Sequence, residues 1–245
     1  LDDSLSSGKI KHVGFSSHTE IDTFVDILDA YPKWEVVLTQ MNYLDEYYQT
    51  GVMGLDELKR LNIGSMIMEP LRGGRLVQNI PPEVQKLWNS AEVKRTPVEW
   101  ALEYLWNRDD VDCVLSGMNS LEQVRQNIQI ASDVKEISEH DHDLIREVAR
   151  TYKTLTGNDC TCCGYCMPCP EDVDIINCFK EYNIGKMLNN PKGSALQYFT
   201  LIDDDCRADS CINCGECEFV CPQMLDIPQE LEKVDEYFGR EFNHF

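Results

Sequence analysis

Apolar and polar positions follow two different periods along the first 159 residues. Short runs predict strands at 11–15, 35–40, 63–68 and 111–116, and the run at 35–40 is β-branched and apolar. The first strand is followed by helical spacing, in which Ile21, Phe24, Val25 and Leu28 recur at i, i+3, i+4 and i+7. Further helices are expected at 52–61, 82–88, 97–106 and 121–130. The pattern is therefore a βα unit used four times.

Two serine-led segments are expected to start helices. Ser17–Glu20 and Ser120–Gln123 both have the spacing of a capping box, in which the serine hydroxyl and the fourth side chain satisfy each other's backbone N–H groups.

Repeated βα units build parallel sheets covered by helices, either an open doubly wound sheet or a (β/α)8 barrel. A complete barrel needs about 250 residues, so four units would form half of one. Sites in such barrels lie at the carboxyl ends of the strands, where the loops 71–74 and 117–120 have chemistry suited to phosphate binding at a helix N-terminus. A turn that needs positive φ would explain their glycines equally well.

Charge excludes some partners. The chain has 43 acidic and 22 basic residues and a net charge of −21, which argues against nucleic acid or an anionic membrane as the main partner. No segment approaches the roughly 20 apolar residues of a membrane span, and no signal segment opens the chain, so a cytoplasmic protein is expected. Because the first residue is Leu1, the chain is expected to begin partway through a longer product.

Cysteine divides the chain into two domains. Of twelve cysteines only Cys113 precedes residue 160, so domains are expected at 1–157 and 158–245, the second small and mainly helical. The cysteines recur at two-residue gaps, which is typical of metal ligands rather than disulfides.

The second cysteine run matches a known ligand pattern. Cys211, Cys214, Cys217 and Cys221, followed by proline, reproduce the C-x2-C-x2-C-x3-C-P spacing of bacterial ferredoxins. Zinc is the alternative, but zinc sites normally take paired C-x2-C knuckles from two places.

The first cysteine run is read as Cys160, Cys163, Cys166 and Cys169, with a final gap one residue shorter. Cys162 could replace Cys160 or Cys163 as a ligand.

The two runs belong to an internal repeat, C-P-x-x-[VL]-D-I, at 169–175 and 221–227. In ferredoxins the cysteine before proline serves the other cluster, which predicts two [4Fe-4S] clusters. One set is Cys160, Cys163, Cys166 and Cys221, and the other is Cys211, Cys214, Cys217 and Cys169. Cys113, Cys162, Cys178 and Cys206 remain as free thiols or small buried residues.

Four segments resemble the second half of an aldo/keto reductase barrel: 8–18, 40–43, 68–74 and 115–127. The cysteine-rich part resembles the ferredoxin-type domain fused to one branch of that family. The resemblance implies a nicotinamide-dependent oxidoreductase acting on a small carbonyl or alcohol. It assigns Ser16, Ser17 and Gln40 to the carboxamide of NAD(P)H, Met68 to the ring face, Pro70, Leu71, Gly73 and Gly74 to the pyrophosphate, and Gly117, Gln123 and Asn127 to the adenosine end.

The sequence departs from the family at informative positions. Ser17 replaces an asparagine, and Met68 replaces an aromatic residue. Gly117 and Gln123 stand where the family has basic residues for a 2′-phosphate, which favours NAD over NADP. The catalytic Asp, Tyr, Lys and His of the family come from its first four strands, and no residue here matches them. The missing half is expected in a longer chain or a partner, unless the remnant does not catalyse.

The two cofactor types transfer different numbers of electrons. Nicotinamide moves a two-electron hydride and a cluster takes one electron, so a coupled enzyme is expected to need an adapter such as flavin. The favoured interpretation is a two-domain redox enzyme connected to a redox partner protein. The alternatives are an electron-transfer subunit with a scaffold barrel, and clusters that only fold the second domain.

Overall fold

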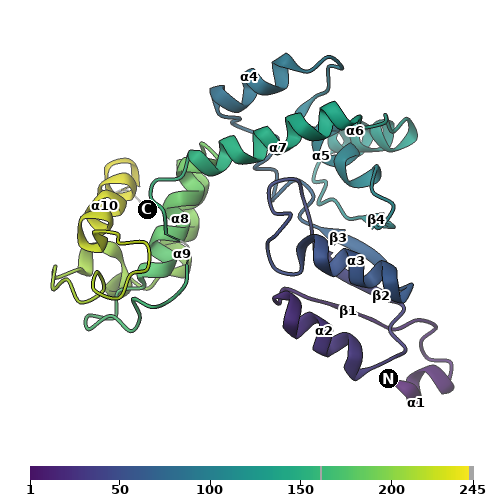
Figure 1. The fold of residues 1–245 in the computed structure, drawn as a ribbon, viewed down its shortest axis with the longest axis horizontal. Coiled ribbons are helices and arrows are strands. Elements are labelled where there is room, and N and C mark those ends of the chain that lie inside the picture. The colour runs from purple at the N-terminus through teal and green to yellow at the C-terminus, as the bar shows by residue number, and fades with distance from the viewer. Residues whose placement is uncertain (161, 243–245) are drawn as a thin grey trace. The chain divides into compact units, whose positions relative to one another are not determined.

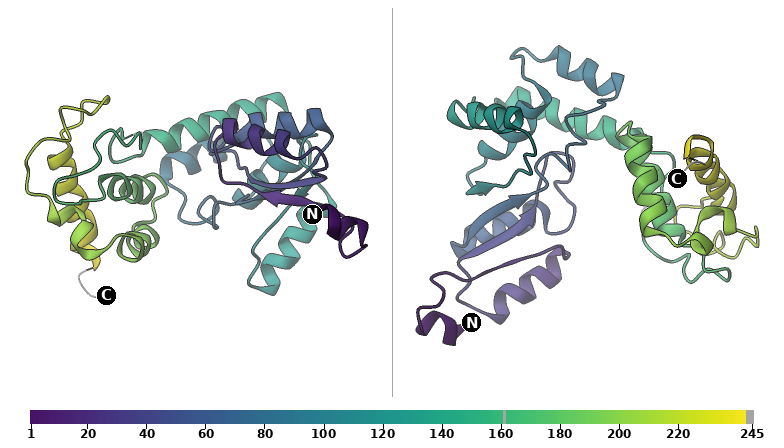
Figure 2. Two further views of the ribbon diagram at one scale, coloured as in Figure 1. Left: turned by 90° about the horizontal axis from the view of Figure 1, so that it is seen from below. Right: turned by 180° about the vertical axis from the view of Figure 1, so that it is seen from behind.

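The computed structural model describes residues 1–160 and 162–242. These residues form two compact units, the first comprising 1–78 and 86–149 and the second comprising 79–85 and the chain from 150 onward. The expected domain boundary at residue 157 stays a prediction. Figures 1 and 2 trace the chain through both units.

The first unit contains a four-stranded parallel sheet in the order β1-β2-β3-β4 (Figure 1). Its strands are β1 (Gly14–Ser16), β2 (Val36–Gln40), β3 (Gly64–Met68) and β4 (Cys113–Val114). Strands that are neighbours in sequence are also neighbours in space, as the repeated βα pattern predicts. The α/β class with a parallel sheet is therefore confirmed. The predicted extent of the last strand is wrong, because only two residues of 111–116 pair with β3.

Seven helices accompany the sheet in sequence: α1 (Asp2–Ser6), α2 (Ile21–Ala30), α3 (Gly51–Leu61), α4 (Pro82–Ser90), α5 (Pro97–Trp106), α6 (Leu121–Ser132) and α7 (Glu139–Thr154). Five of them fall where the periodicity predicts them, and α1 and α7 were not predicted. Among the helices of the described residues, none has the length and apolar character needed to cross a bilayer.

Helices α2 and α3 lie on one face of the sheet (Figure 2, left). On that face Thr39 and Ile67 are fully buried, and the Thr39 hydroxyl lies 2.6 Å from the hydroxyl of Thr50 at the start of α3. Leu55 and Leu58 of α3 are also buried. Each such side chain contributes roughly 1.5–3 kcal/mol relative to exposure, which fixes α3 against β2 and β3.

The capping predictions are only partly right. The box at Ser17 is wrong, because α2 begins after Glu20 and the Ser17 hydroxyl instead accepts a hydrogen bond from the Thr19 N–H at 3.2 Å. Ser120 does cap α6, accepting from the Gln123 N–H at 3.2 Å. The Gln123 side chain, however, accepts from Asn119 N–H rather than from the serine.

The second unit is built mainly from α8 (Ile175–Met187), α9 (Pro191–Leu201) and α10 (Ile227–Phe242), with two short 3-10 helices, η1 (Asp204–Cys206) and η2 (Ala208–Ser210). Its core includes Phe179, Tyr198 and Phe238, and the last two rings stack with centroids 4.3 Å apart. Several cysteines of the two runs pack against this core, so the core positions both cysteine loops.

Candidate functional site

One cavity of about 460 Å³ lies where β3 and β4 end. This size falls within the range of about 300–1,000 Å³ that is usual for small-molecule sites. Its walls include seven of the predicted nucleotide residues: Pro70, Leu71, Gly73 and Gly74 from the loop after β3, and Gly117, Gln123 and Asn127 from the segment that follows β4.

The loop after β3 is shaped by two glycines. Gly73 and Gly74 have φ of +63° and +83°, conformations that side chains with a Cβ rarely adopt. The requirement for positive φ alone therefore accounts for both glycines. Their two N–H groups donate to no described residue, which leaves them available to an anion beside the cavity.

A buried polar network holds this loop to the end of β2. The Nδ2 of Asn42 donates to the Asp45 carboxylate at 2.9 Å and to the Glu69 carbonyl at 3.1 Å, while its Oδ1 accepts from the N–H groups of Leu44 and Asp45, each at 3.0 Å. Arg72 contributes an ion pair to the same carboxylate, with Nε 3.1 Å from Asp45 Oδ2. The chain thus fixes Glu69, whose φ is +57°, at the rim of the cavity.

Asp45 is the member of this network that the sequence analysis missed. Its signal is local, because the Asx turn made by the Asn42 side chain brings the carboxylate three residues later within reach of Asn42 Nδ2. Its long-range pairing with Arg72 has no such local signal.

The four residues assigned to the nicotinamide end do not line the cavity. Ser16 is exposed at the end of β1, and Ser17 is buried in its turn. Gln40 donates from Nε2 to Asp45 at 3.1 Å, and Met68, its partner in the sheet register, is half-buried. Their role at a nicotinamide ring stays a prediction.

Among the described residues around the cavity there is no lysine or arginine, and Glu69 is the one charged side chain. A dianionic 2′-phosphate would gain no ion pair from this lining.

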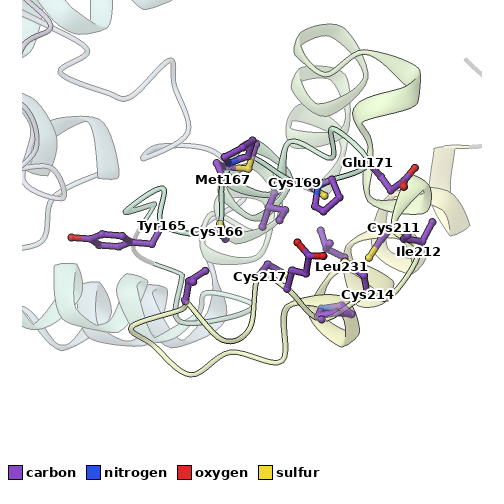
Figure 3. Close-up of a pocket in the computed structure, with 17 residues that line it drawn as sticks. Tyr165, Cys166, Met167, Cys169, Glu171, Cys211, Ile212, Cys214, Cys217 and Leu231 are labelled. Carbon is purple, nitrogen blue, oxygen red and sulfur yellow. The ribbon is translucent and has the colours of Figure 1, made fainter.

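The cysteines of the second unit line two further cavities. We call the first the Cys211 cavity; its sulfur ligand candidates are Cys169, Cys211, Cys214 and Cys217, with Cys166 also on its wall (Figure 3). We call the second the Cys160 cavity; its walls carry Cys160, Cys163, Cys166 and Cys221, together with Cys162. Each cavity thus combines three cysteines of one loop with the cysteine before proline from the other loop.

The two loops share one backbone conformation. Gly164 and Gly215, which occupy equivalent positions, have φ of +80° and +76°. Each carbonyl accepts from the N–H three residues later, at 3.0 Å in the first loop and 3.1 Å in the second. Cys162 and Asn213, one residue before the second cysteine of each run, both have φ of +57°.

The equivalence continues into the following helices. Asp174 and Asp226 each accept from the N–H three residues later at 3.1 Å, just before α8 and α10 begin. The repeat seen in the sequence is therefore a repeat of loop, cap and helix.

Two of the thiols that line the Cys211 cavity have a raised pKa. Burial raises the pKa of Cys217 to about 11, and the neighbouring Cys211 and Cys214 add to the shift. Burial likewise raises the pKa of Cys166. Metal binding to such thiols has to displace their protons, so it would be coupled to pH.

Among the described residues, no three His, Cys, Asp or Glu side chains converge closely enough to hold a single metal ion. The cysteines stand around two spaces rather than around one point.

The remaining cysteines differ in exposure. Cys178 is fully buried in the core of the second unit, and burial raises its pKa to about 12. Cys206 is half-buried, and Cys113 is exposed on β4.

Comparison with known proteins finds a family match over the first part of the chain. Residues 1–150 match the aldo/keto reductase family. Solved structures similar to this chain include the holo and apo forms of aldo-keto reductase AKR11C1 from Bacillus halodurans, each with 20% identity and a TM-score of 0.50 over 60% of this chain. The matched part covers 53% of the holo chain and 54% of the apo chain, so this chain spans about half the length of these structures. At this identity the likeness shows the fold alone. No curated protein matches the chain.

Proposed function

The chain belongs to the aldo/keto reductase family, and from this premise we propose that it is part of an oxidoreductase that couples carbonyl or alcohol chemistry to iron–sulfur electron transfer. The nicotinamide cofactor would bind in the first unit, and two [4Fe-4S] clusters would bind in the second. The substrate class is a small carbonyl compound or alcohol, and the proposed location is the cytoplasm.

The observation that carries this proposal is the grouping of cysteines into two sets. Each of the two cavities is lined by the first three proposed ligands of one run and by the cysteine before proline of the other run, with Cys166 on both walls and Cys162 on the wall of the Cys160 cavity. A disulfide or zinc-knuckle protein does not need a cysteine of one loop to stand beside the three cysteines of the other loop. When bound, each cluster would supply a one-electron site, while the protein orients the sulfurs and keeps them beside an apolar core.

The cavity at the ends of β3 and β4 supports nucleotide binding at the pyrophosphate and adenosine ends. The free N–H groups of Gly73 and Gly74 suit a pyrophosphate, and the lining without lysine or arginine favours NAD over NADP. A flavin is proposed as the adapter between hydride and single-electron transfer, because the chemistry requires one in a coupled enzyme.

Metal and sulfide analysis of protein purified without oxygen tests the clusters. We expect about eight iron atoms and eight sulfides per chain, the content of two four-iron clusters. Replacing Cys169 or Cys221 by serine should each lower the content of one cluster, whereas Cys178→Ser, which removes a buried thiol outside both cavities, should leave the iron content unchanged. Colourless protein that contains zinc and no sulfide would overturn the proposal.

A Cys162→Asn variant tests which cysteines are ligands. Asn213 occupies the equivalent position in the second loop with the same φ, so asparagine should be accommodated without strain. We expect wild-type iron content. If Cys162→Asn loses iron while Cys160→Ser or Cys163→Ser retains it, Cys162 is a ligand in place of the cysteine whose variant retains iron.

A second candidate function is an electron-transfer subunit whose barrel portion is a scaffold. It is favoured by one observation: Ser16, Ser17, Gln40 and Met68 lie outside the nucleotide cavity. NADH fluorescence titration separates the two functions. Submicromolar binding supports the oxidoreductase, and no binding by cluster-loaded protein supports the scaffold.

A further inference from the structure

Exposed apolar side chains gather around the Cys211 cavity. Tyr165, Ile212 and Val220 belong to its lining and are 68%, 61% and 50% exposed. Phe219, next to Val220 in the chain, is 91% exposed. Single exposed apolar residues are common on proteins, but three in one cavity lining, with a fourth next to one of them in the chain, form a group that is typical of an interaction site.

The same region is acidic. Glu171 and Glu216 also line the cavity, and both are exposed. Between Ala208 and Asp226 the sequence has four carboxylates and no lysine or arginine. Figure 3 shows Glu171 and Ile212 on one side of the cysteines and Tyr165 on the other. Among the described residues that line the cavity, the charged side chains are the carboxylates of Glu171 and Glu216.

We propose that this surface, consisting of Tyr165, Ile212, Phe219 and Val220 with Glu171 and Glu216, is the docking site for a redox protein that presents an apolar contact surrounded by lysine and arginine. We call it the Cys211 face. The inference rests on the proposed function, because it gives the cluster held by Cys211, Cys214, Cys217 and Cys169 the role of exchanging electrons with this partner.

Charge and exposure both argue for a basic protein as the occupant. Attraction between a negative surface and a basic partner raises the rate of encounter, while the apolar contact needs only a small area in a transient complex. Cys214 is itself exposed, so a partner seated on the face would approach the cluster ligands directly. An anionic membrane would be repelled by the same carboxylates.

Electron transfer from the reduced, cluster-loaded protein to a cytochrome c of high isoelectric point tests the inference. This basic haem protein is a probe of the surface and not the natural partner. The second-order rate should fall as salt is added, since exposed charges are screened over about 8 Å at physiological ionic strength. At low salt, Glu171→Gln with Glu216→Gln should lower the rate about 3- to 10-fold.

Matched variants separate the effect of this surface on the rate from the effects of overall charge and hydrophobicity. Glu92→Gln with Asp22→Asn removes two exposed carboxylates of the first unit and should leave the rate unchanged. Phe219→Ser should lower the rate, whereas Leu201→Ser, at an apolar residue of α9 that is 65% exposed, should not. Iron and sulfide content is measured for every variant and should equal that of the wild type.

The outcomes separate the inference from the proposed function. If the protein binds no iron, both are wrong. If every variant is loaded and transfers electrons at the wild-type rate, only the docking site is wrong. If Phe219→Ser turns a dimer into a monomer and leaves the rate unchanged, the face joins two copies of this chain, and the inference is again overturned.

Discussion

Asn42→Ala should weaken the first unit and its nucleotide cavity together. Asn42 is fully buried and makes four hydrogen bonds, two donated from Nδ2 and two accepted by Oδ1. A net contribution of about 0.5–1.5 kcal/mol for each bond gives a loss of roughly 2–6 kcal/mol. Asp45 keeps its bonds to Gln40 and Arg72, so we expect the lower half of that range, about 2–4 kcal/mol.

Guanidinium unfolding followed by tryptophan fluorescence measures this loss. All four tryptophans of the chain, Trp34, Trp88, Trp100 and Trp106, lie in the first unit, so the signal reports that unit. Gln129→Ala removes an exposed amide from α6 and should change the unfolding free energy by less than about 0.5 kcal/mol.

The same variant should lower the affinity for NADH. The Asn42 side chain binds the Glu69 carbonyl at the start of the loop that carries Gly73 and Gly74, so its loss frees the loop to leave the conformation that lines the cavity. A stability within about 0.5 kcal/mol of the wild type would refute the assignment of the network. A destabilised variant that binds NADH normally would refute the link between network and cavity.

Three further results are expected. Gly74→Ala should cost about 1 kcal/mol of stability and weaken NADH binding in titrations, because φ at this position is +83°. Gly239→Ala, whose Cβ would lie 3.8 Å from Asp235, should not destabilise the protein. Equal effects of the two substitutions would contradict the role of the turn. Gln123→Arg should raise affinity for NADPH relative to NADH, and an unchanged ratio would remove this residue from the adenosine end. For Cys178, the folded-state pKa of about 12 exceeds its ordinary value of 9.0, so the stability contributed by the protonated thiol is complete below pH 9 and is lost as pH rises from 9 toward 12. Iodoacetamide at pH 8 should therefore label exposed Cys113 and spare Cys178 until the protein unfolds, and rapid labelling of both in folded protein would contradict its burial.

Hydrophobic periodicity predicted the βα order because helices such as α2 and α3 bury a single face. Phe24 and Leu28 of α2, for example, are both buried at the spacing that indicated the helix. Strand lengths were less predictable, since pairing depends on the neighbouring strand. The run at 111–116 is apolar at four of its six positions, yet the strand comprises only Cys113 and Val114.

Helix caps and polar contacts, like the strands, were only partly predictable from the sequence. Ser120 caps α6 with the spacing expected, but Ser17 bonds to Thr19 inside a turn, because its hydroxyl finds a nearer partner than the start of the helix. The pairing of Asp45 with Arg72 joins loops after two different strands. No local pattern marks such a pair, so the sequence could suggest the cavity's glycines but not the network that holds them.

The two cysteine loops share a local backbone conformation, as their sequence repeat suggests, while the identity of the ligands stays a prediction. The shorter final gap in the first run left the ligand frame open between Cys160, Cys162 and Cys163. In the second run, Asn213 has the same left-handed φ as Cys162 and likewise stands one residue before the second cysteine. Asparagine is no ligand for iron in such loops. A position that needs this φ and tolerates asparagine is set by backbone conformation, which favours Cys160, Cys163 and Cys166 as the ligands and leaves Cys162 as a residue of the turn.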